Sequence, residues 1–198
     1  MSKIKKYDEA VVKKFKEFVG TKEFKKLNKR FNPEKFAGTW KQTLSSPSTS
    51  FIGSGPNFSS VQATYTLKNS GLVGVKNEAY NIQLDKVSAT GTSRARDDDI
   101  PMCRTVKFNN LFKIEGDYWL IFATPSFNTV IVAAPIIVNV FNIPFVVANN
   151  FGFYVLTRNK RNFWKDPKEY QPTLDALKHY GFTNLLNRPV VTASSFEL

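Results

Sequence analysis

Few side chains in this sequence of 198 residues could do covalent or acid–base chemistry. The chain has one cysteine, Cys103, and one histidine, His179. A nucleophile needs a base within hydrogen-bond reach, and a metal centre needs several ligands held together. These two residues lie far apart in the sequence, and the acidic run 97–99 is more simply a solvated loop than a cation site. We therefore expect a protein that is not an enzyme and that carries no cofactor and no metal.

Basic residues dominate the charge, with 28 Lys and Arg against 16 Asp and Glu, which gives a net charge of +12. Residues 1–30 hold eleven basic and four acidic side chains, more than half of the excess. Such a charge favours contact with polyanions. No motif that reads nucleic acid is present, and aromatic residues do not alternate with basic ones on a strand face, so nucleic acid is not the expected partner.

The element that carries most of this charge is an amphipathic helix, predicted from about Asp8 to Gly20. Apolar residues recur there at helical spacing, with lysines between them. Two interpretations remain open. The apolar stripe packs on the main domain and leaves the lysines in solvent, or the basic helix lies on an anionic membrane or another polyanion.

From Gly38 onward the sequence changes to eight short β-rich runs separated by turn residues such as Asn69-Ser70-Gly71. Eight successive antiparallel strands at hairpin spacing predict a sandwich or an up-and-down barrel. The predicted strands are Gly38–Leu44, Ser60–Leu67, Leu72–Tyr80, Lys86–Ala95, Cys103–Phe108, Tyr118–Ala123, Thr129–Ala134 and Phe151–Thr157.

A C-terminal helix is predicted to begin near Pro172 and to end at Gly181. A further helical turn is expected at 166–169, where Glu169 stands three residues after an acidic N-cap.

The interval 118–157 has no charged residue. Pro135 and Pro144, with several asparagines, argue against a spanning helix there. The apolar stretch 135–150 either lengthens the last hairpin or forms a loop that faces lipid or a partner. The first residues do not read as a secretory signal peptide, so we expect an intracellular, cytoplasmic location. Association with an anionic membrane through residues 1–30 and 135–150 is the open alternative.

The segment Asn32-Pro33-Glu34-Lys35-Phe36-Ala37-Gly38-Thr39-Trp40 is a capped turn that runs into Gly-x-Trp at the first strand. Together with the order of the strands and the C-terminal helix ending at Tyr180-Gly181-Phe182, it resembles a lipocalin. The likeness is to the branch of apolipoprotein D and the bacterial outer-membrane lipocalins, over roughly 32–192. One departure is Thr124-Pro125-Ser126-Phe127, which stands where family members usually carry a Thr/Asp-x-Asp-Tyr-like turn.

The resemblance implies an all-β fold, namely an eight-stranded antiparallel up-and-down β-barrel of the calycin type. An N-terminal amphipathic helix and a C-terminal helix would pack outside the barrel. The expected division is a helical extension at 1–31, the barrel with its C-terminal helix at 32–192, and a tail at 193–198.

The resemblance also implies that Arg158 packs across Trp40 at the barrel floor. A guanidinium over an indole face contributes about 0.5–2 kcal/mol, and Gly38 would let the entering turn approach the floor closely. These three residues are expected to be structural.

The expected function is non-catalytic binding or transport of a small hydrophobic ligand, such as a fatty acid or lysophospholipid, in the barrel cavity. Period-two alternation places eight residues on the inward face, with Tyr65 and Asn77 as polar contacts. The alternative is an interaction or packaging protein that uses the basic helix on an anionic membrane or nucleic acid, with the barrel as scaffold. The predicted ligand-binding residues are Ala63, Tyr65, Leu67, Val73, Val75, Asn77, Val106 and Phe108.

Overall fold

The computed structural model describes residues 9–52, 58–95, 100–109, 115–140, 143–185 and 187–193. The acidic run 97–99, residues 1–8 of the predicted extension and most of the predicted tail lie outside the described residues.

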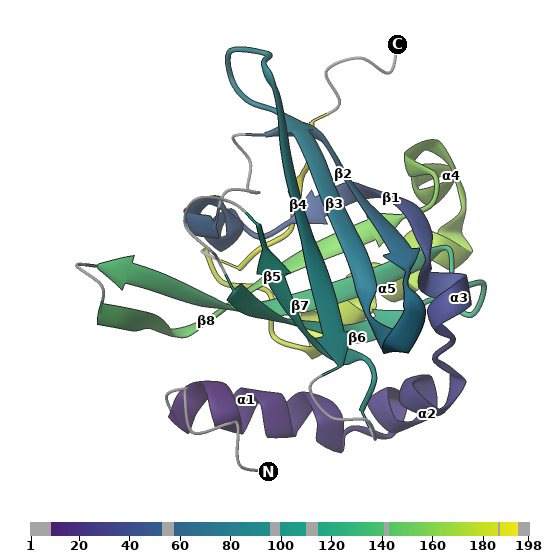
Figure 1. Ribbon diagram of the computed structural model, residues 1–198. Coiled ribbons are helices and arrows are strands. Elements are labelled where there is room, and N and C mark those ends of the chain that lie inside the picture. The colour runs from purple at the N-terminus through teal and green to yellow at the C-terminus, as the bar shows by residue number, and fades with distance from the viewer. Residues whose placement is uncertain are drawn as a thin grey trace.

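Eight antiparallel strands close into a barrel, because β1 pairs with β8 on one side and with β2 on the other (Figure 1). The other strands pair with their sequence neighbours, as hairpin connections predict. The predicted eight-stranded antiparallel up-and-down barrel is therefore confirmed. The strands are β1 (Gly38–Ser45), β2 (Ser59–Leu67), β3 (Val73–Tyr80), β4 (Lys86–Ala95), β5 (Cys103–Phe108), β6 (Glu115–Ala123), β7 (Thr129–Val140), β8 (Ile143–Thr157) and the short β9 (Val190–Val191), which pairs with β1.

The antiparallel order sends the connections to two opposite ends of the barrel. The starts of β1, β3, β5 and β7 and the ends of β2, β4, β6 and β8 lie at one end, called the base below. The 3₁₀ helix η2 (Pro47–Ile52) and the opposite ends of these strands lie at the other, called the far end.

The last hairpin is longer than the predicted strands. Pairing of β7 with β8 runs from Thr129 and Thr157 out to Val140 and Ile143, past a register shift near Pro135. The hairpin projects beyond the barrel wall in Figure 1. The stretch 135–150 therefore lengthens the hairpin, as the first interpretation held. The alternation of side chains predicted shorter strands here, because a bulge interrupts the two-residue period of the alternation.

Two N-terminal helices, α1 (Glu9–Gly20) and α2 (Lys22–Arg30), lie outside the barrel (Figure 1). The buried ring of Phe18 meets Tyr180 at 5.3 Å, Phe151 at 5.7 Å and Trp119 at 6.2 Å between ring centroids. Thr21 separates the two helices and caps α2. The apolar stripe thus packs on the barrel wall, so the first interpretation of the amphipathic segment is confirmed.

The opposite side of these helices is basic. Lys16, Lys25 and Lys29 are exposed there, with Glu17 and Glu23 among them. In the described part of the chain, no helix combines the length and the apolar character that crossing a membrane requires.

The C-terminal helices are α4 (Lys160–Lys165) and α5 (Pro167–His179). The predicted start of α5 near Pro172 is wrong. The side chain of Asp166 caps the helix by accepting from the Lys168 amide at 2.9 Å, so the predicted turn at 166–169 is its first turn. An N-cap followed by Pro at the first helical position is the stronger start signal. Gly181, with φ of +76°, follows the helix end as predicted.

Candidate functional site

A pair of tyrosines identifies the inward face of the barrel. Tyr65 on β2 and Tyr118 on β6 are joined by a hydrogen bond between their hydroxyl groups. The strands β2 and β6 are four positions apart in an eight-stranded ring, so this bond crosses the lumen. Side chains that alternate in phase with Tyr65 and Tyr118 therefore face the lumen.

The base of the lumen is filled by aromatic rings. Phe36, from the short helix α3 (Pro33–Phe36), lies 4.6 Å from Tyr65 and 5.5 Å from Trp40 between ring centroids. Trp40 is fully buried, and its Nε1 donates to the Phe36 carbonyl at 2.7 Å. These rings pack against one another and form a floor at the base of the lumen.

Arg158 lies beneath this floor as the sequence analysis expects. Its Cζ is 3.7 Å from the Trp40 ring centroid, and its guanidinium donates to the carbonyls of Ala37 at 2.8 Å and Thr39 at 3.0 Å. Gly38 has φ of +97°, and a Cβ there would come within 3.1 Å of Arg158 Nη1. The close approach of the guanidinium therefore requires a glycine.

A second group of hydrogen bonds at the base was not predicted from the sequence. The buried carboxylate of Glu169 accepts hydrogen bonds from Thr124 Oγ1 at 3.0 Å, from Thr129 Oγ1 at 2.6 Å and from Ser126. The turn that departs from the usual family pattern is thus anchored to α5. The sequence signal was three hydroxyl residues in one turn, while Glu169 itself was assigned to helix capping.

Both tyrosines of the lumen pair are electrically neutral. Burial raises the pKa of Tyr65, and burial together with its neighbour Tyr65 raises the pKa of Tyr118 well above its ordinary value. The Tyr65 hydroxyl, predicted as a contact to ligand, is instead engaged by Tyr118. A ligand could use it only by breaking that bond.

The inward face has a different character beyond the tyrosine pair. Ala63, Asn77 and Ala89 are direct neighbours across β2, β3 and β4. Asn77, Ala89 and Phe108 face inward but remain partly exposed to solvent. The Asn77 Oδ1 atom is buried and accepts no hydrogen bond. An unfilled acceptor among small residues is unusual inside a protein, because buried polar groups are normally paired.

The structure divides the predicted ligand residues between two places. Leu67 and Val73 lie at the base, where they line a separate pocket. Tyr65 belongs to the floor. The residues on the lumen face beyond or beside the tyrosine pair are Ala63, Val75, Asn77, Val106 and Phe108.

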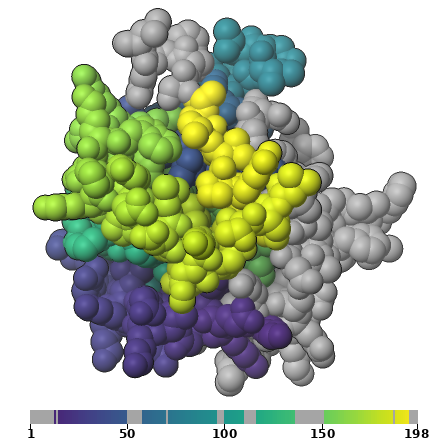
Figure 2. All heavy atoms as spheres, turned by 180° about the vertical axis from the view of Figure 1, so that it is seen from behind, coloured from purple at the N-terminus to yellow at the C-terminus, as the bar shows by residue number. Residues whose placement is uncertain are grey.

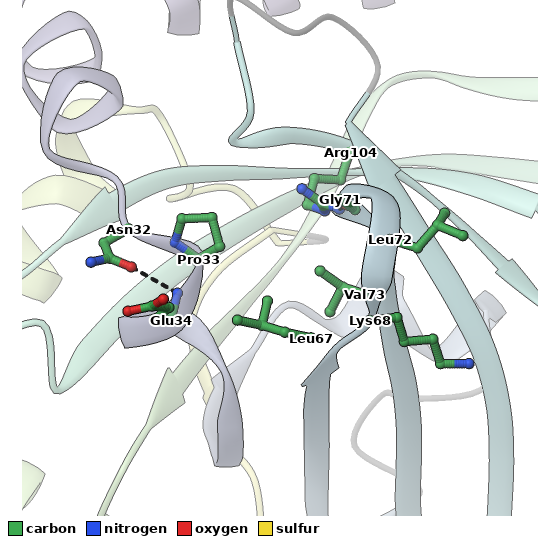
Figure 3. Close-up of a pocket in the computed structure, with 9 residues that line it drawn as sticks. All are labelled: Asn32, Pro33, Glu34, Leu67, Lys68, Gly71, Leu72, Val73 and Arg104. Atoms are coloured by element: carbon green, nitrogen blue, oxygen red, sulfur yellow. Dashed lines mark hydrogen bonds between the residues drawn. The ribbon is translucent and has the colours of Figure 1, made fainter.

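The pocket at the base has a volume of about 390 Å³ and lies between α3 and the β2–β3 hairpin (Figure 3). Pro33, Leu67, Leu72 and Val73 supply apolar wall, and Arg104 lines it from β5. The sequence analysis did not anticipate this pocket, because α3 and the hairpin meet only in the folded barrel.

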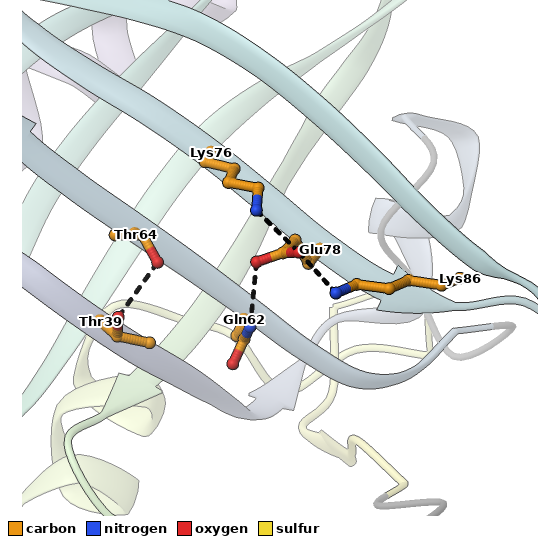
Figure 4. A network of polar contacts seen from close by, with 6 residues as sticks. All are labelled: Thr39, Gln62, Thr64, Lys76, Glu78 and Lys86. Atoms are coloured by element: carbon orange, nitrogen blue, oxygen red, sulfur yellow. Dashed lines mark hydrogen bonds and ion pairs between the residues drawn. The ribbon is translucent and has the colours of Figure 1, made fainter.

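The outer face of β2, β3 and β4 carries a network of ion pairs and hydrogen bonds centred on Glu78 (Figure 4). The Glu78 carboxylate lies 3.0 Å from Lys76 Nζ and 2.8 Å from Lys86 Nζ, and it accepts from Gln62 Nε2 at 3.1 Å. Hydrogen bonds from Lys86 and then Lys76 lower the pKa of Glu78 to about 2.

The candidate catalytic residues are not assembled into a site. Cys103 is buried on β5, and His179 is exposed at the end of α5. Within the described ranges, no group of three or more His, Cys, Asp or Glu side chains is placed to hold a metal ion.

The family model of the lipocalin-like domain matches residues 31–143, more than half of the chain. No curated protein sequence is significantly similar to the chain.

Several solved structures share the fold. Lobster apocrustacyanin A1 superposes with a TM-score of 0.61 at 14% identity, over 86% of this chain and 85% of that one. The cockroach allergen Per a 4 has a TM-score of 0.59 at 16% identity, over 84% and 90%. The siderocalin Ex-FABP has a TM-score of 0.55 at 11% identity, over 81% and 91%. Identities this low show the common fold alone.

Proposed function

Because the chain belongs to the lipocalin-like family, we propose that it binds a small hydrophobic ligand in the far half of its barrel, beyond the Tyr65–Tyr118 pair. The floor of aromatic rings would form the bottom of this site. Burial of apolar ligand surface would supply most of the affinity, at about 25 cal/mol per Å². The siderocalin that shares the fold functions through dual ligand specificities.

The unfilled Asn77 Oδ1 acceptor is the observation that carries this proposal. It lies on the lumen face beside Ala63 and Ala89, whose small side chains leave room next to it. A buried acceptor without a donor costs about 1–3 kcal/mol. A ligand that brings a hydroxyl group to Asn77 would recover that cost. The favoured ligand is therefore an apolar molecule with one hydrogen-bond donor, such as a sterol-like or fatty alcohol or a fatty acid in its neutral form.

A matched pair of variants on β4 tests where the ligand binds. Ala89 faces the lumen opposite Asn77, and Thr90 is exposed on the outer face. Ala89→Trp should block uptake of a fluorescent sterol and of a fluorescent fatty alcohol, while Thr90→Trp should bind both as the unmodified protein does. Equal binding by the two variants would refute a lumen site.

Asn77→Leu tests the polar contact separately. We expect it to weaken binding of the fluorescent alcohol about 3–10-fold, as for loss of one hydrogen bond, and to leave binding of the matching hydrocarbon unchanged. Native mass spectrometry of gently purified protein, followed by organic extraction, would identify a co-purified ligand. An unchanged affinity for the alcohol would remove Asn77 from the site.

A second candidate function rests on the basic side of α1 and α2. The apolar side of these helices packs against the barrel wall. Contact with an anionic membrane would therefore be electrostatic, and neither helix would insert into the bilayer. Lys25 and Lys29 are exposed one helical turn apart. Deleting residues 1–30 would uncover Trp119 and Phe151, so charge reversal is the cleaner test.

Lys25→Glu with Lys29→Glu should weaken binding to vesicles of phosphatidylserine and phosphatidylcholine at low salt. The control is Lys165→Glu with Lys168→Glu, which makes the same charge change on α4 and α5, where both lysines are exposed. An equal loss of vesicle binding in both double variants would mean that binding depends on the net charge of the protein and not on the basic side of α1 and α2.

A further inference from the structure

Arg104 is a buried cation whose partners are all neutral. Only 6% of the residue is exposed. Its Nε donates to Ser93 Oγ at 2.9 Å, and Nη2 donates to the carbonyls of Ser93 at 3.1 Å and Gly71 at 3.2 Å. Nη1 donates to the Pro101 carbonyl at 3.3 Å. These bonds use four of the five N–H donors of a guanidinium and leave one on Nη1.

No carboxylate balances this charge within the described ranges. The two ion pairs of the outer-face network, Lys76–Glu78 and Lys86–Glu78, do not involve Arg104. A buried charge is costly unless an opposite charge accompanies it. Burial lowers the pKa of Arg104, but a guanidinium keeps its proton in proteins. The positive charge therefore persists, rigidly held and, among the residues that the structure describes, without a carboxylate partner.

The pocket at the base gives a ligand access to this charge. Arg104 lines it, together with apolar wall from Leu67, Leu72 and Val73. Figure 3 shows the Lys68 side chain pointing away from α3 and the Glu34 carboxylate on the side of α3 away from the hairpin. Arg104 is therefore the charged group directed at the space between them.

The size and lining of the pocket limit what it could take. Its volume of about 390 Å³ equals that of about a dozen water molecules, at roughly 30 Å³ each. A molecule of about ten non-hydrogen atoms fits this space. The apolar walls favour a ligand with a short hydrocarbon part, and the guanidinium favours a ligand with a negative charge.

We propose that the pocket at the base binds the carboxylate end of a small amphipathic anion, with Arg104 as its anchor. The carboxylate takes the remaining Nη1–H, and the hydrocarbon part lies against Leu67 and Val73, whose side chains point into the space in front of α3 (Figure 3). Neither Asn77 nor Ala63 lines this pocket, and on β2 Tyr65 stands between Leu67 and Ala63. The site is therefore distinct from the one proposed in the far half of the barrel and does not depend on the proposed function.

Sodium octanoate is the probe, titrated into the full chain and followed by nuclear magnetic resonance. We expect saturable shifts of the Gly71 and Leu72 amides and of the Arg104 Nε–H. Octanol, which has the same chain length and no charge, should bind there about tenfold or more weakly, because the charge-assisted hydrogen bond is lost.

Two exposed neighbours on β2 provide the variant and its control. Leu67→Glu places a carboxylate at the pocket, where Leu67 is 41% exposed, and should weaken octanoate binding about tenfold. Thr66→Glu makes the same charge change on the opposite face of the strand and should leave binding within about twofold. Both sites are exposed, so neither variant threatens the fold.

Equal binding of octanol and octanoate would overturn the proposal, as would equal effects of the two glutamates. Shifts confined to Ala63 and Asn77 would also overturn it, while supporting the lumen site. The Ala89→Trp variant should block the lumen ligand and leave the octanoate shifts at Gly71 and Leu72 intact, which separates the two sites.

Discussion

The base and the far half of the barrel are built from the same strands and differ in what meets them. At the base, α3, the β6–β7 turn and α5 converge, and they bring Phe36, Glu169 and the Arg158–Trp40 stack together. In the far half, the inward-facing Asn77 and Ala89 remain partly exposed to solvent. The most extensive packing is therefore at the base, and the far half is where we propose that ligand binds.

The largest expected effect is at the base. Trp40→Ala removes a fully buried indole, which is also the ring on which the Arg158 guanidinium stacks. We therefore expect the free energy of unfolding to fall by about 3–5 kcal/mol. Denaturant unfolding measures it. Trp164→Ala is the matched control, because Trp164 is 44% exposed and should cost about 1 kcal/mol or less. Comparable losses of unfolding free energy in the two variants would contradict the conclusion that packing at the base contributes most to stability.

The tyrosine pair marks the boundary between the two regions, and breaking it should have an intermediate effect. Tyr65→Phe leaves the hydroxyl of the partly buried Tyr118 without its partner, which should cost about 1–3 kcal/mol. The double variant with Tyr118→Phe should cost less than the sum of the two single variants, because no orphaned hydroxyl remains. Strict additivity would mean that the bond contributes nothing.

The pH dependence of stability should report the same pair. Both pKa values are raised by burial, so the folded state holds protons that the unfolded chain releases near pH 10. The contribution is therefore fully present below about pH 10 and is lost as the pH rises further. Tyrosinate absorbance should show that these two residues titrate only when the chain unfolds. Early titration of either residue would place it in contact with solvent.

Filling the far half should cost little by comparison. Ala89 is already partly exposed, so Ala89→Trp should change the free energy of unfolding by about 1 kcal/mol or less while it occupies the lumen. Denaturant unfolding beside Thr90→Trp measures the difference. A loss of 2 kcal/mol or more would show overpacking and a lumen tighter than we infer.

The smallest effect is expected on the outer face. Glu78→Gln breaks two ion pairs whose lysines are exposed, and it should cost about 0–1 kcal/mol. The pKa of Glu78 is lowered to about 2, so its contribution is present above the ordinary carboxyl value near 4.5. It should fade as the pH falls from there towards 2. A difference from the unmodified protein that persists unchanged at pH 2 would contradict this assignment.

Local patterns predicted most of the elements. Alternation and turn residues located the eight strands, and helical spacing located α1 together with the side it buries. The start of α5 was misplaced because Pro172 competed with the stronger signal at Asp166 and Pro167. The β7–β8 hairpin was underestimated because the register shift near Pro135 interrupts the pattern.

From the sequence alone came the order of the strands, through periodicity and turn residues, and the barrel with its Trp40–Arg158 floor, through the resemblance carried by the motifs of the first and last strands. Only the tertiary structure decided what each inward side chain does. It paired Tyr65 with Tyr118 across the lumen, bound Glu169 to three hydroxyls and left Asn77 and Arg104 without full partners. The physical reason is that these relations join elements apart in the chain, and only closure of the barrel and packing of α5 against its base bring them within hydrogen-bond reach.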